Sequence, residues 1–378
     1  MLVWPFPPNK STETWSFLTD VQETYSRENR RSLRKGAFLS MSLSSSLSET
    51  ELGLADGLYR AALASREDVF VPLWGQAQAA PGVLSVGSSS LPVDASLGDW
   101  FLGYALIWTS PLVWELVEVS SPDDFLPGAV RPATVQLAST TVSEVVSPLI
   151  IPVSPGYFSK GLSISREGFN NVSVGAEFRG LGDIFVNETT WQTVGGFLVS
   201  PERELQAGGQ MTLVRPETFV DNGTGPVVRV PTKDHFANTR PFSLRSTTLS
   251  QRQTTRNNLL YLEGRMKEFV RISTVVGEVS IPGVNLSAGD TIPLTYAGPR
   301  LALVGRLLYL KTTGGEFLRE IVSADTTTVT LDGNFPATTP SERLRVALAD
   351  RTRLDTDELG LQDTPGNGAV FSLTLKDL

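Results

Sequence analysis

Hydrophobic and polar residues follow a similar succession twice along the chain, each time beginning with a predicted helix. Each helix opens with a capping box, in which a Ser and the residue three positions later satisfy free backbone amides: Ser48 with Glu51, and Ser250 with Gln253. Apolar residues near helical spacing follow, namely Leu52, Ala55, Leu58, Tyr59, Ala62 and Leu63 in the first stretch and Leu259, Leu260, Leu262, Met266 and Phe269 in the second. The pattern predicts one amphipathic helix in each half.

Each predicted helix runs into a β-rich segment with the same order of strands. A Phe-Val dipeptide begins that segment, at 70–71 and at 269–270, and two strands separated by turn residues follow it. The expected strands lie at 106–108, 114–119, 134–137 and 172–178 in the first copy, and at 307–310, 317–322, 328–331 and 370–375 in the second. We interpret this order as a tandem duplication. The alternative is that small β domains share similar strand and turn patterns without a common origin.

These elements predict a mainly β fold with two tandem related units, each a β-barrel or β-sandwich with one α-helix. We expect an extended N-terminal arm and basic segment at 1–35, a first β-rich unit at 36–181, a connector at 182–240 and a second β-rich unit at 241–378. An Asn-Gly pair at 222–223 is a strong tight-turn signal, so the connector is expected to contain a β-hairpin.

Composition narrows the class of protein. A chain of 378 residues, 19% charged and 40% hydrophobic, suits two globular domains. The net charge of −8 argues against a dedicated nucleic-acid binder, whose affinity needs a basic footprint. The lack of cysteine excludes disulfides and thiolate chemistry, and one histidine leaves little basis for a His-based metal site. No membrane span or signal peptide is apparent, so we expect a soluble protein made in a cytoplasm.

The N-terminal stretch supplies candidate interface residues. Its prolines favour extended geometry and leave little local core for Trp4 and Phe6, so we expect these side chains to dock on a neighbouring chain. A basic cluster follows and completes the candidate oligomer interface: Arg27, Arg30, Arg31 and Arg34. The alternative for the cluster is a solvated face with local ion pairs.

No arrangement of residues in the sequence indicates a catalytic site. His235 lies among charged and aromatic neighbours, which favours a surface turn over a triad base. The carboxylates at 355–358 suit a hard cation, but the glycine and distal glutamate of an EF-hand loop are missing, which favours an exposed acidic strand start. We therefore expect no enzymatic activity, no cofactor and no metal site.

Several short motifs, taken in order, resemble landmarks of tail proteins from bacteriophages with long flexible tails. They are Trp4-Pro-Phe-Pro-Pro-Asn9, Arg27-Glu-Asn-Arg-Arg-Ser-Leu-Arg34, Val71-Pro-Leu-Trp74, Asp221-Asn-Gly-Thr-Gly-Pro-Val227, Leu262-Glu-Gly-Arg265 and Arg353-Leu-Asp-Thr-Asp-Glu358. The resemblance extends essentially from end to end. It departs at Phe269-Val-Arg-Ile272, where members of the group often carry Phe-Trp-Leu-Pro.

The resemblance implies a virion component of the tail tip without a catalytic role, similar to distal tail or baseplate hub proteins. We expect a minor tail protein, assembled in the host cytoplasm, whose ring couples the tail tube to the baseplate hub and fibres. Expected partners are copies of itself in a three-fold or six-fold ring, the tail tube protein, the tape measure protein and the hub or fibre proteins, with no membrane and no sequence-specific nucleic acid.

Two other functions stay open. One is a trimeric baseplate hub whose duplicated domains give pseudo-six-fold symmetry. The other is a carbohydrate-binding receptor-recognition protein that uses Trp74, Trp108 and Trp114 as a sugar platform, although burial in a core or interface is the more ordinary role for these indoles.

Overall fold

The structure, a computed structural model, describes most of the chain. It describes residues 1–378 except 24–27, 35, 123–133, 167–171, 185, 187, 201–205, 208–211, 215–216, 221–227, 232–236, 274–277, 297, 299–302, 365–367 and 378.

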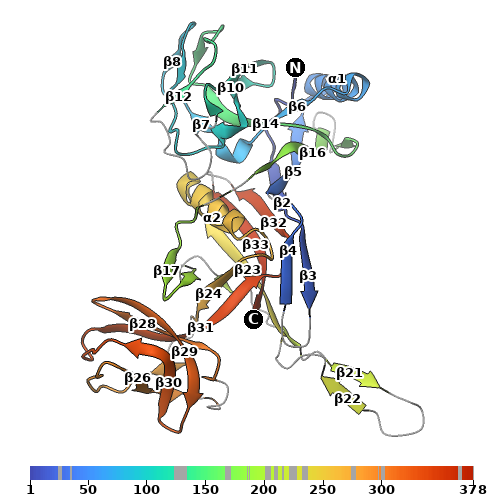
Figure 1. Ribbon diagram of the computed structural model, residues 1–378. Coiled ribbons are helices and arrows are strands. Elements are labelled where there is room, and N and C mark those ends of the chain that lie inside the picture. Colours follow the sequence, from blue (N-terminus) through green and yellow to red (C-terminus); the bar gives the residue numbers. More distant parts are fainter. Residues whose placement is uncertain are drawn as a thin grey trace.

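Short strands and two α-helices make up the described part of the fold (Figure 1). The N-terminal segment holds β1 (Leu2–Val3), β2 (Lys10–Ser16), β3 (Thr19–Glu23) and β4 (Glu28–Ser32). The first half holds β5 (Ala37–Leu47), α1 (Glu49–Ser65), β6 (Val69–Pro72), the 3-10 turn η1 (Trp74–Gln76), β7 (Gln78–Ala79), β8 (Val83–Leu84), β9 (Ser90–Leu91), the 3-10 turn η2 (Trp100–Leu102), β10 (Tyr104–Ser110), β11 (Val113–Glu118), β12 (Val135–Gln136), β13 (Val145–Val146), β14 (Leu149–Phe158), β15 (Ser163–Arg166) and β16 (Val172–Ile184).

The connector and the second half also consist mainly of short strands. The connector holds β17 (Gln192–Val194), β18 (Phe197–Val199), β19 (Gln206–Ala207), β20 (Thr212–Val214), β21 (Glu217–Val220) and β22 (Val228–Pro231). The second half holds β23 (Ala237–Ser246), α2 (Leu249–Tyr261), β24 (Glu268–Ile272), β25 (Val279–Ser280), β26 (Gly289–Pro293), β27 (Thr295–Tyr296), β28 (Leu307–Thr312), β29 (Gly315–Ala324), β30 (Thr328–Phe335), β31 (Arg343–Leu354), β32 (Glu358–Thr364) and β33 (Gly368–Asp377).

One antiparallel sheet runs through both halves. Its strands follow the order β15, β16, β5, β2, β32, β33 and β23. Strand β2 lies in the middle, with Thr14 opposite Ser40 of β5 on one side and opposite Gly360 of β32 on the other. The N-terminal segment therefore joins the halves edge to edge instead of forming a separate arm.

The strand pairings of the first half recur in the second. In the first half β5 pairs with β16, β16 with β15 and β14, β14 with β6 and β10, and β10 with β11. In the second half β23 pairs with β33, β33 with β32 and β31, β31 with β24 and β28, and β28 with β29. In both halves the α-helix directly follows the first of these strands.

The segments before β6 and before β24 also match. Strand β1 pairs in parallel with β6, with Val3 opposite Phe70, and β18 pairs in parallel with β24, with Val199 opposite Val270. By these pairings Phe70 of the first half corresponds in position to Val270 of the second half. The Phe-Val dipeptides instead align Phe70 with Phe269, so the alignment expected from the sequence is off by one residue.

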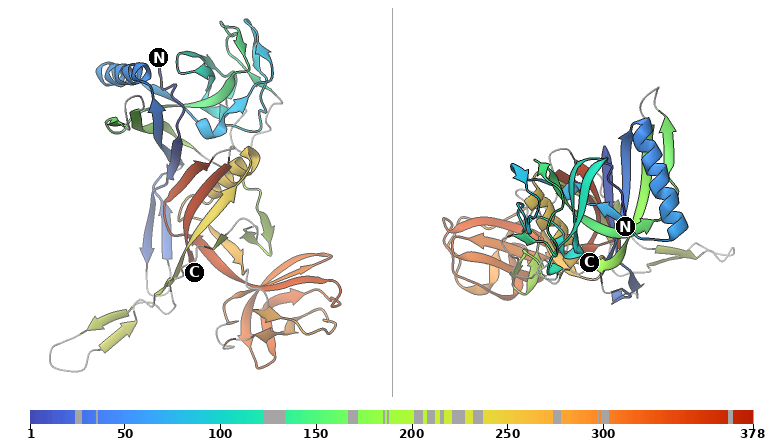
Figure 2. Two further views of the ribbon diagram at one scale, coloured as in Figure 1. Left: turned by 180° about the vertical axis from the view of Figure 1, so that it is seen from behind. Right: turned by 90° about the horizontal axis from the view of Figure 1, so that it is seen from above.

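A lobe with its own core lies at each end of the molecule (Figures 1 and 2). The core of the first-half lobe includes Ile107, Val117 and Ile150. The core of the second-half lobe includes Leu310 and Ile321. The smaller pairings differ between the lobes, because β8 pairs with β13 and β9 with β12 in the first, whereas β30 pairs with β26 and β29 in the second.

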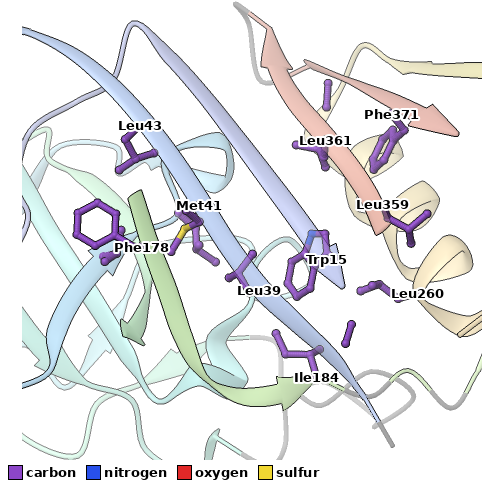
Figure 3. Close-up of a cluster of buried hydrophobic side chains, with 14 of the residues drawn as sticks. Trp15, Leu39, Met41, Leu43, Phe178, Ile184, Leu260, Leu359, Leu361 and Phe371 are labelled. Carbon is purple, nitrogen blue, oxygen red and sulfur yellow. The ribbon is translucent and has the colours of Figure 1, made fainter. Parts of the chain in front are cut away.

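The largest hydrophobic cluster crosses the boundary between the halves. Figure 3 shows Met41 and Phe178 of the first half, Trp15 of β2, and Leu361 and Phe371 of the second half within this cluster. Trp15 is 1% exposed and packs between the two halves. Buried and more exposed positions alternate on β2 and β5, since every second side chain of a strand points to the same face. The inward positions of β5 are mostly apolar, whereas those of β2 are Ser11, Glu13 and Trp15.

The expectation of a mainly β fold with one helix in each half is confirmed. Among the described strands, no sheet closes on itself. The expected hairpin in the connector is formed by β21 and β22, whose turn falls outside the described residues. This hairpin projects from the body in Figures 1 and 2.

The predicted cap of the first helix is confirmed, and that of the second is displaced. Ser48 caps α1, and the Glu51 carboxylate accepts from the Ser48 amide at 2.8 Å. Helix α2 is capped by Thr248, two residues before the expected Ser250. The prediction of a cap at Ser250 is wrong because Gln253 turns into the protein, while Gln251 performs the capping contacts.

Candidate functional site

The N-terminal aromatic side chains predicted to dock on a neighbouring chain lie inside this chain's own core. Trp4 and Phe6 are both 0% exposed, with ring centroids 4.9 Å apart. Trp4 also packs edge-on against Phe178, and its amide donates to the carbonyl of Phe70 at 3.0 Å. Their assignment to an oligomer interface is therefore wrong, because β1 pairs with β6 as a strand of the first-half sheet and the two rings pack into this chain's own core.

The predicted basic cluster does not form a single patch. The Arg30 guanidinium pairs with Glu268 and donates to the Met266 carbonyl at 3.1 Å, which ties the β3–β4 hairpin to the second half. The Arg34 guanidinium lies over the Phe38 ring, whereas Arg31 is exposed. Arg27 lies outside the described residues. Arg31 thus remains as the exposed candidate, and Arg30 serves a contact within the chain.

Buried charges gather where α2 meets the first half. Asp99, directly before η2, is 0% exposed and receives two bonds from the Arg256 guanidinium, one of them 2.5 Å long from Nη2 to Oδ1. Gln76 of η1 donates to Asp99 Oδ2 at 2.7 Å, and Gln253 of α2 donates to Oδ1 at 3.0 Å. The carboxylate thus accepts hydrogen bonds from both halves of the chain.

A second buried ion pair lies beside the first on the same face of α2. Arg252 Nη2 is 2.6 Å from Glu13 Oε1 on β2 and 2.9 Å from Asp363 Oδ1 on β32. Gly75 of η1 faces this group, and a Cβ at that position would clash with Asp363 and come within 2.6 Å of Arg252 Nη2. Glycine at 75 therefore permits η1 to approach the ion pair. We call these two groups together the junction cluster.

Burial and pairing shift the junction carboxyls in opposite directions. Burial alone raises the pKa of Asp99, but the Arg256 guanidinium and the amides of Gln76 and Gln253 lower it below its ordinary value. Burial dominates at Glu13, whose pKa lies above its ordinary value even though Arg252 opposes the shift. With its partners fixed on both sides, the junction cluster is suited to holding the halves together.

The acidic strand start at 355–358 is engaged in a structural contact. The Asp357 carboxylate accepts from the amide of Thr19 at 2.7 Å and from the amide of Arg265 at 3.1 Å. Burial raises the pKa of Asp357, but these hydrogen bonds and the Arg265 guanidinium lower it below its ordinary value. Within the part of the chain that the structure describes, no group of three or more His, Cys, Asp or Glu side chains could hold a metal ion. His235 lies outside that part.

A polar cavity of about 370 Å³ lies between α2, the first half and the connector. Ser250, Thr254 and Asn257 line it from the helix, and Ser96 and Thr190 line it from the first half and the connector. The Asn258 carboxamide beside it accepts from the Thr190 amide at 2.9 Å. The lining thus consists mainly of hydroxyl and amide groups, with one carboxylate residue, Glu188.

The three tryptophans of the sugar-platform alternative are unequally exposed. Trp108 packs edge-on against Trp74, and its Nε1 donates to the Pro5 carbonyl at 2.9 Å. Trp114, opposite Trp108 on the β10–β11 hairpin, is 37% exposed. Trp74 and Trp108 thus stabilise the N-terminal segment, and Trp114 is the one of the three that offers a partly open indole.

Comparisons with family models and with curated proteins identify no relative of this chain: no family model matches it, and the search of curated proteins found no match. In the described part of the chain, neither helix combines the length and apolar character needed to cross a bilayer.

The junction cluster was not anticipated from the sequence. Arg252, Gln253 and Arg256 resemble the solvated face of an amphipathic helix, and Asp99 lies in a Gly- and Ser-rich stretch without periodicity. One signal was present: α2 has polar residues on every side and lacks a clean apolar stripe. Such a helix is either highly solvated or packed against polar partners, and here it is packed.

Proposed function

We propose that this protein is a structural ring subunit of a long flexible phage tail, located at the tail tip and without catalytic activity. The observation that carries the proposal is the recurrence of one set of strand pairings in both halves. A tandem duplication accounts for that recurrence with the least assumption. The resemblance of the sequence motifs to tail-tip proteins supplies the location.

The way the halves meet favours a ring. Strand β2 joins β5 to β32, so that the two units lie side by side in one sheet instead of stacking face to face. Repetition of a lateral contact between like units generates a closed ring when the rotation closes. Three copies then present six similar units, which fits a six-fold tube on one side and a three-fold tip on the other. This is the hub version of the proposal.

A ring of six identical chains, as in a distal tail protein, is the second candidate. It shares the partners of the first: copies of this chain, the tail tube and tape measure proteins, and the hub or fibre proteins. The duplicated pairings favour three copies, because six copies would present twelve units to a six-fold tube. The sugar-binding alternative has the weaker support of one partly exposed indole, Trp114.

Antibody labelling of virions tests the location. Gold-labelled antibodies against the purified chain should mark the end of the tail away from the head, and they should mark it on particles whose fibres have been removed. Labelling along the tail or on the head would contradict the proposed position. Absence from purified particles would contradict a virion role.

A further inference from the structure

The edge strand of the first half is open where its counterpart in the second half is covered. Among the described strands β15 pairs with β16 alone, and all four of its residues are exposed. Strand β32 occupies the same place beside β33, and its other edge is filled by β2. An exposed edge with unpaired amides and carbonyls is a ready template for another strand.

A strand of the matching kind lies at the opposite end of the sheet. Strand β23 corresponds to β5, and β20 pairs with it where β2 pairs with β5: Thr212 is opposite Thr239 as Thr14 is opposite Ser40. Strand β19 extends the same edge, with Ala207 opposite Phe242. Within the chain β2 goes on to pair with β32, whereas β19 and β20 pair with β23 alone among the described strands.

The two helices differ in the same way as the two edge strands, since α2 is covered within the chain and α1 is more exposed. In α2, Arg252, Gln253 and Arg256 are buried by their partners in the junction cluster. Counted from the caps Thr248 and Ser48, the matching residues of α1 are Leu52, Gly53 and Asp56. Gly53 is exposed, and a Cβ added at Gly53 or at the following Gly57 would meet no atom within 4 Å. The face of α1 that carries Gly53 and Gly57 is thus uncovered within this chain.

We infer that a second copy of this chain covers these surfaces, with β20 of one copy pairing antiparallel to β15 of the next and with α1 facing the next copy. This inference rests on the proposed ring and specifies its contact. The register follows from the pairing within the chain: Thr14 lies opposite Gly360, so Thr212 lies opposite Ser163 of the next copy. Each contact between copies repeats the contact between the halves.

The contact between copies differs from the junction within the chain in its chemistry. Leu52 and Asp56 stand where α2 has Arg252 and Arg256, and Arg166 stands where β32 has Asp363. The buried arginine–carboxylate pairs of the junction cluster have no counterpart there. Backbone hydrogen bonds between β20 and β15 supply the contact in place of these ion pairs, so copies separate under conditions that leave each chain folded.

Disulfide trapping tests the register directly, because the chain has no cysteine of its own. Residues directly opposite on antiparallel strands have Cα atoms about 4.5–5.5 Å apart, within the roughly 4.4–6.8 Å that a disulfide spans. The double variant Ser163→Cys/Thr212→Cys should give covalent dimers and trimers on oxidation. The matched variant Thr14→Cys/Gly360→Cys, which joins the halves within one chain, should oxidise and still migrate as a monomer.

The outcomes separate this inference from the proposed function. A ring that keeps its mass but gives no cross-linked species in the Ser163/Thr212 variant would overturn the strand pairing and leave the ring standing. A chain that stays monomeric would overturn both. Shifting one cysteine by two residues, to Ser165, should sharply reduce cross-linking; equal cross-linking at both positions would contradict the register.

A variant on α1 tests the second part of the contact. Gly57→Arg adds a long side chain where nothing lies within 4 Å, and replacing a helical glycine favours the helix. We expect unchanged or higher thermal stability of the chain together with at least a ten-fold weaker assembly. Gly283→Arg, at another glycine with open space around it, is the control and should assemble normally. Normal assembly of Gly57→Arg would contradict the placement of α1.

Discussion

Removing Arg256 should be among the most destabilising single changes in this chain. The substitution Arg256→Met keeps the length of the side chain and deletes both hydrogen bonds to Asp99. Asp99 is 0% exposed and keeps Gln76 and Gln253 as donors, but it loses its counter-charge. An unpaired buried charge of this kind costs about 3–5 kcal/mol. Against a typical total of about 5–15 kcal/mol, this is a large share of the stability.

Urea unfolding followed by tryptophan fluorescence is a suitable assay, since the buried Trp100 directly follows Asp99. We expect a lower midpoint and a broader transition, because the halves lose a contact that couples their unfolding. The double variant Asp99→Asn/Arg256→Met removes the stranded charge and should recover much of the loss. A cycle over the two single variants and the double variant measures the coupling.

The matched control is an exposed pair on the other helix. Asp56 and Arg60 of α1 form an ion pair four residues apart, with side chains 42% and 76% exposed. Removing it with Asp56→Asn should cost no more than about 0.5 kcal/mol. If Arg256→Met costs no more than Asp56→Asn, the argument that the junction cluster couples the halves is refuted.

Three further predictions concern the junction and the core. Gly75→Ala places a methyl group against Asp363 and should lower the unfolding midpoint and increase proteolysis between the halves, whereas Gly283→Ala should do neither. Asp99 and Asp357 have lowered pKa values in the folded chain. The stability that they provide is therefore present above the ordinary aspartate pKa of about 3.9 and is lost as the pH falls through their folded pKa values. Asp99→Asn should flatten the acid limb of a plot of unfolding free energy against pH. Trp4→Ala should cost about 3–5 kcal/mol, because the indole is fully buried in the first-half core, and an unchanged midpoint would contradict that packing.

Much of the architecture could be predicted from local sequence signals. The capping box at Ser48 and Glu51 predicted the start of α1, and the turn residues between the β10 and β11 sequences predicted their hairpin. These signals work because caps and tight turns depend on a few neighbouring residues. The mainly β class followed from the number of such short segments.

Longer-range contacts could not be predicted in this way. Trp4 and Phe6 looked exposed because nothing near them in sequence could bury them, and the sheet that does so comes from residues far along the chain. Strand β2 gave no sign that it would pair with β32, over three hundred residues away. The cap of α2 was misplaced because Ser250 and Gln253 satisfy the local pattern, while burial against Asp99 decides where Gln253 points.

The mass of the assembly tests the central claim most directly. Sedimentation of the purified full-length chain, at low salt and at high salt, should give a closed species of three copies that presents six similar units. A species of six copies would instead favour the distal-tail arrangement and contradict the pseudo-six-fold hub. A monomer at every concentration, with the fold intact, would contradict the ring itself.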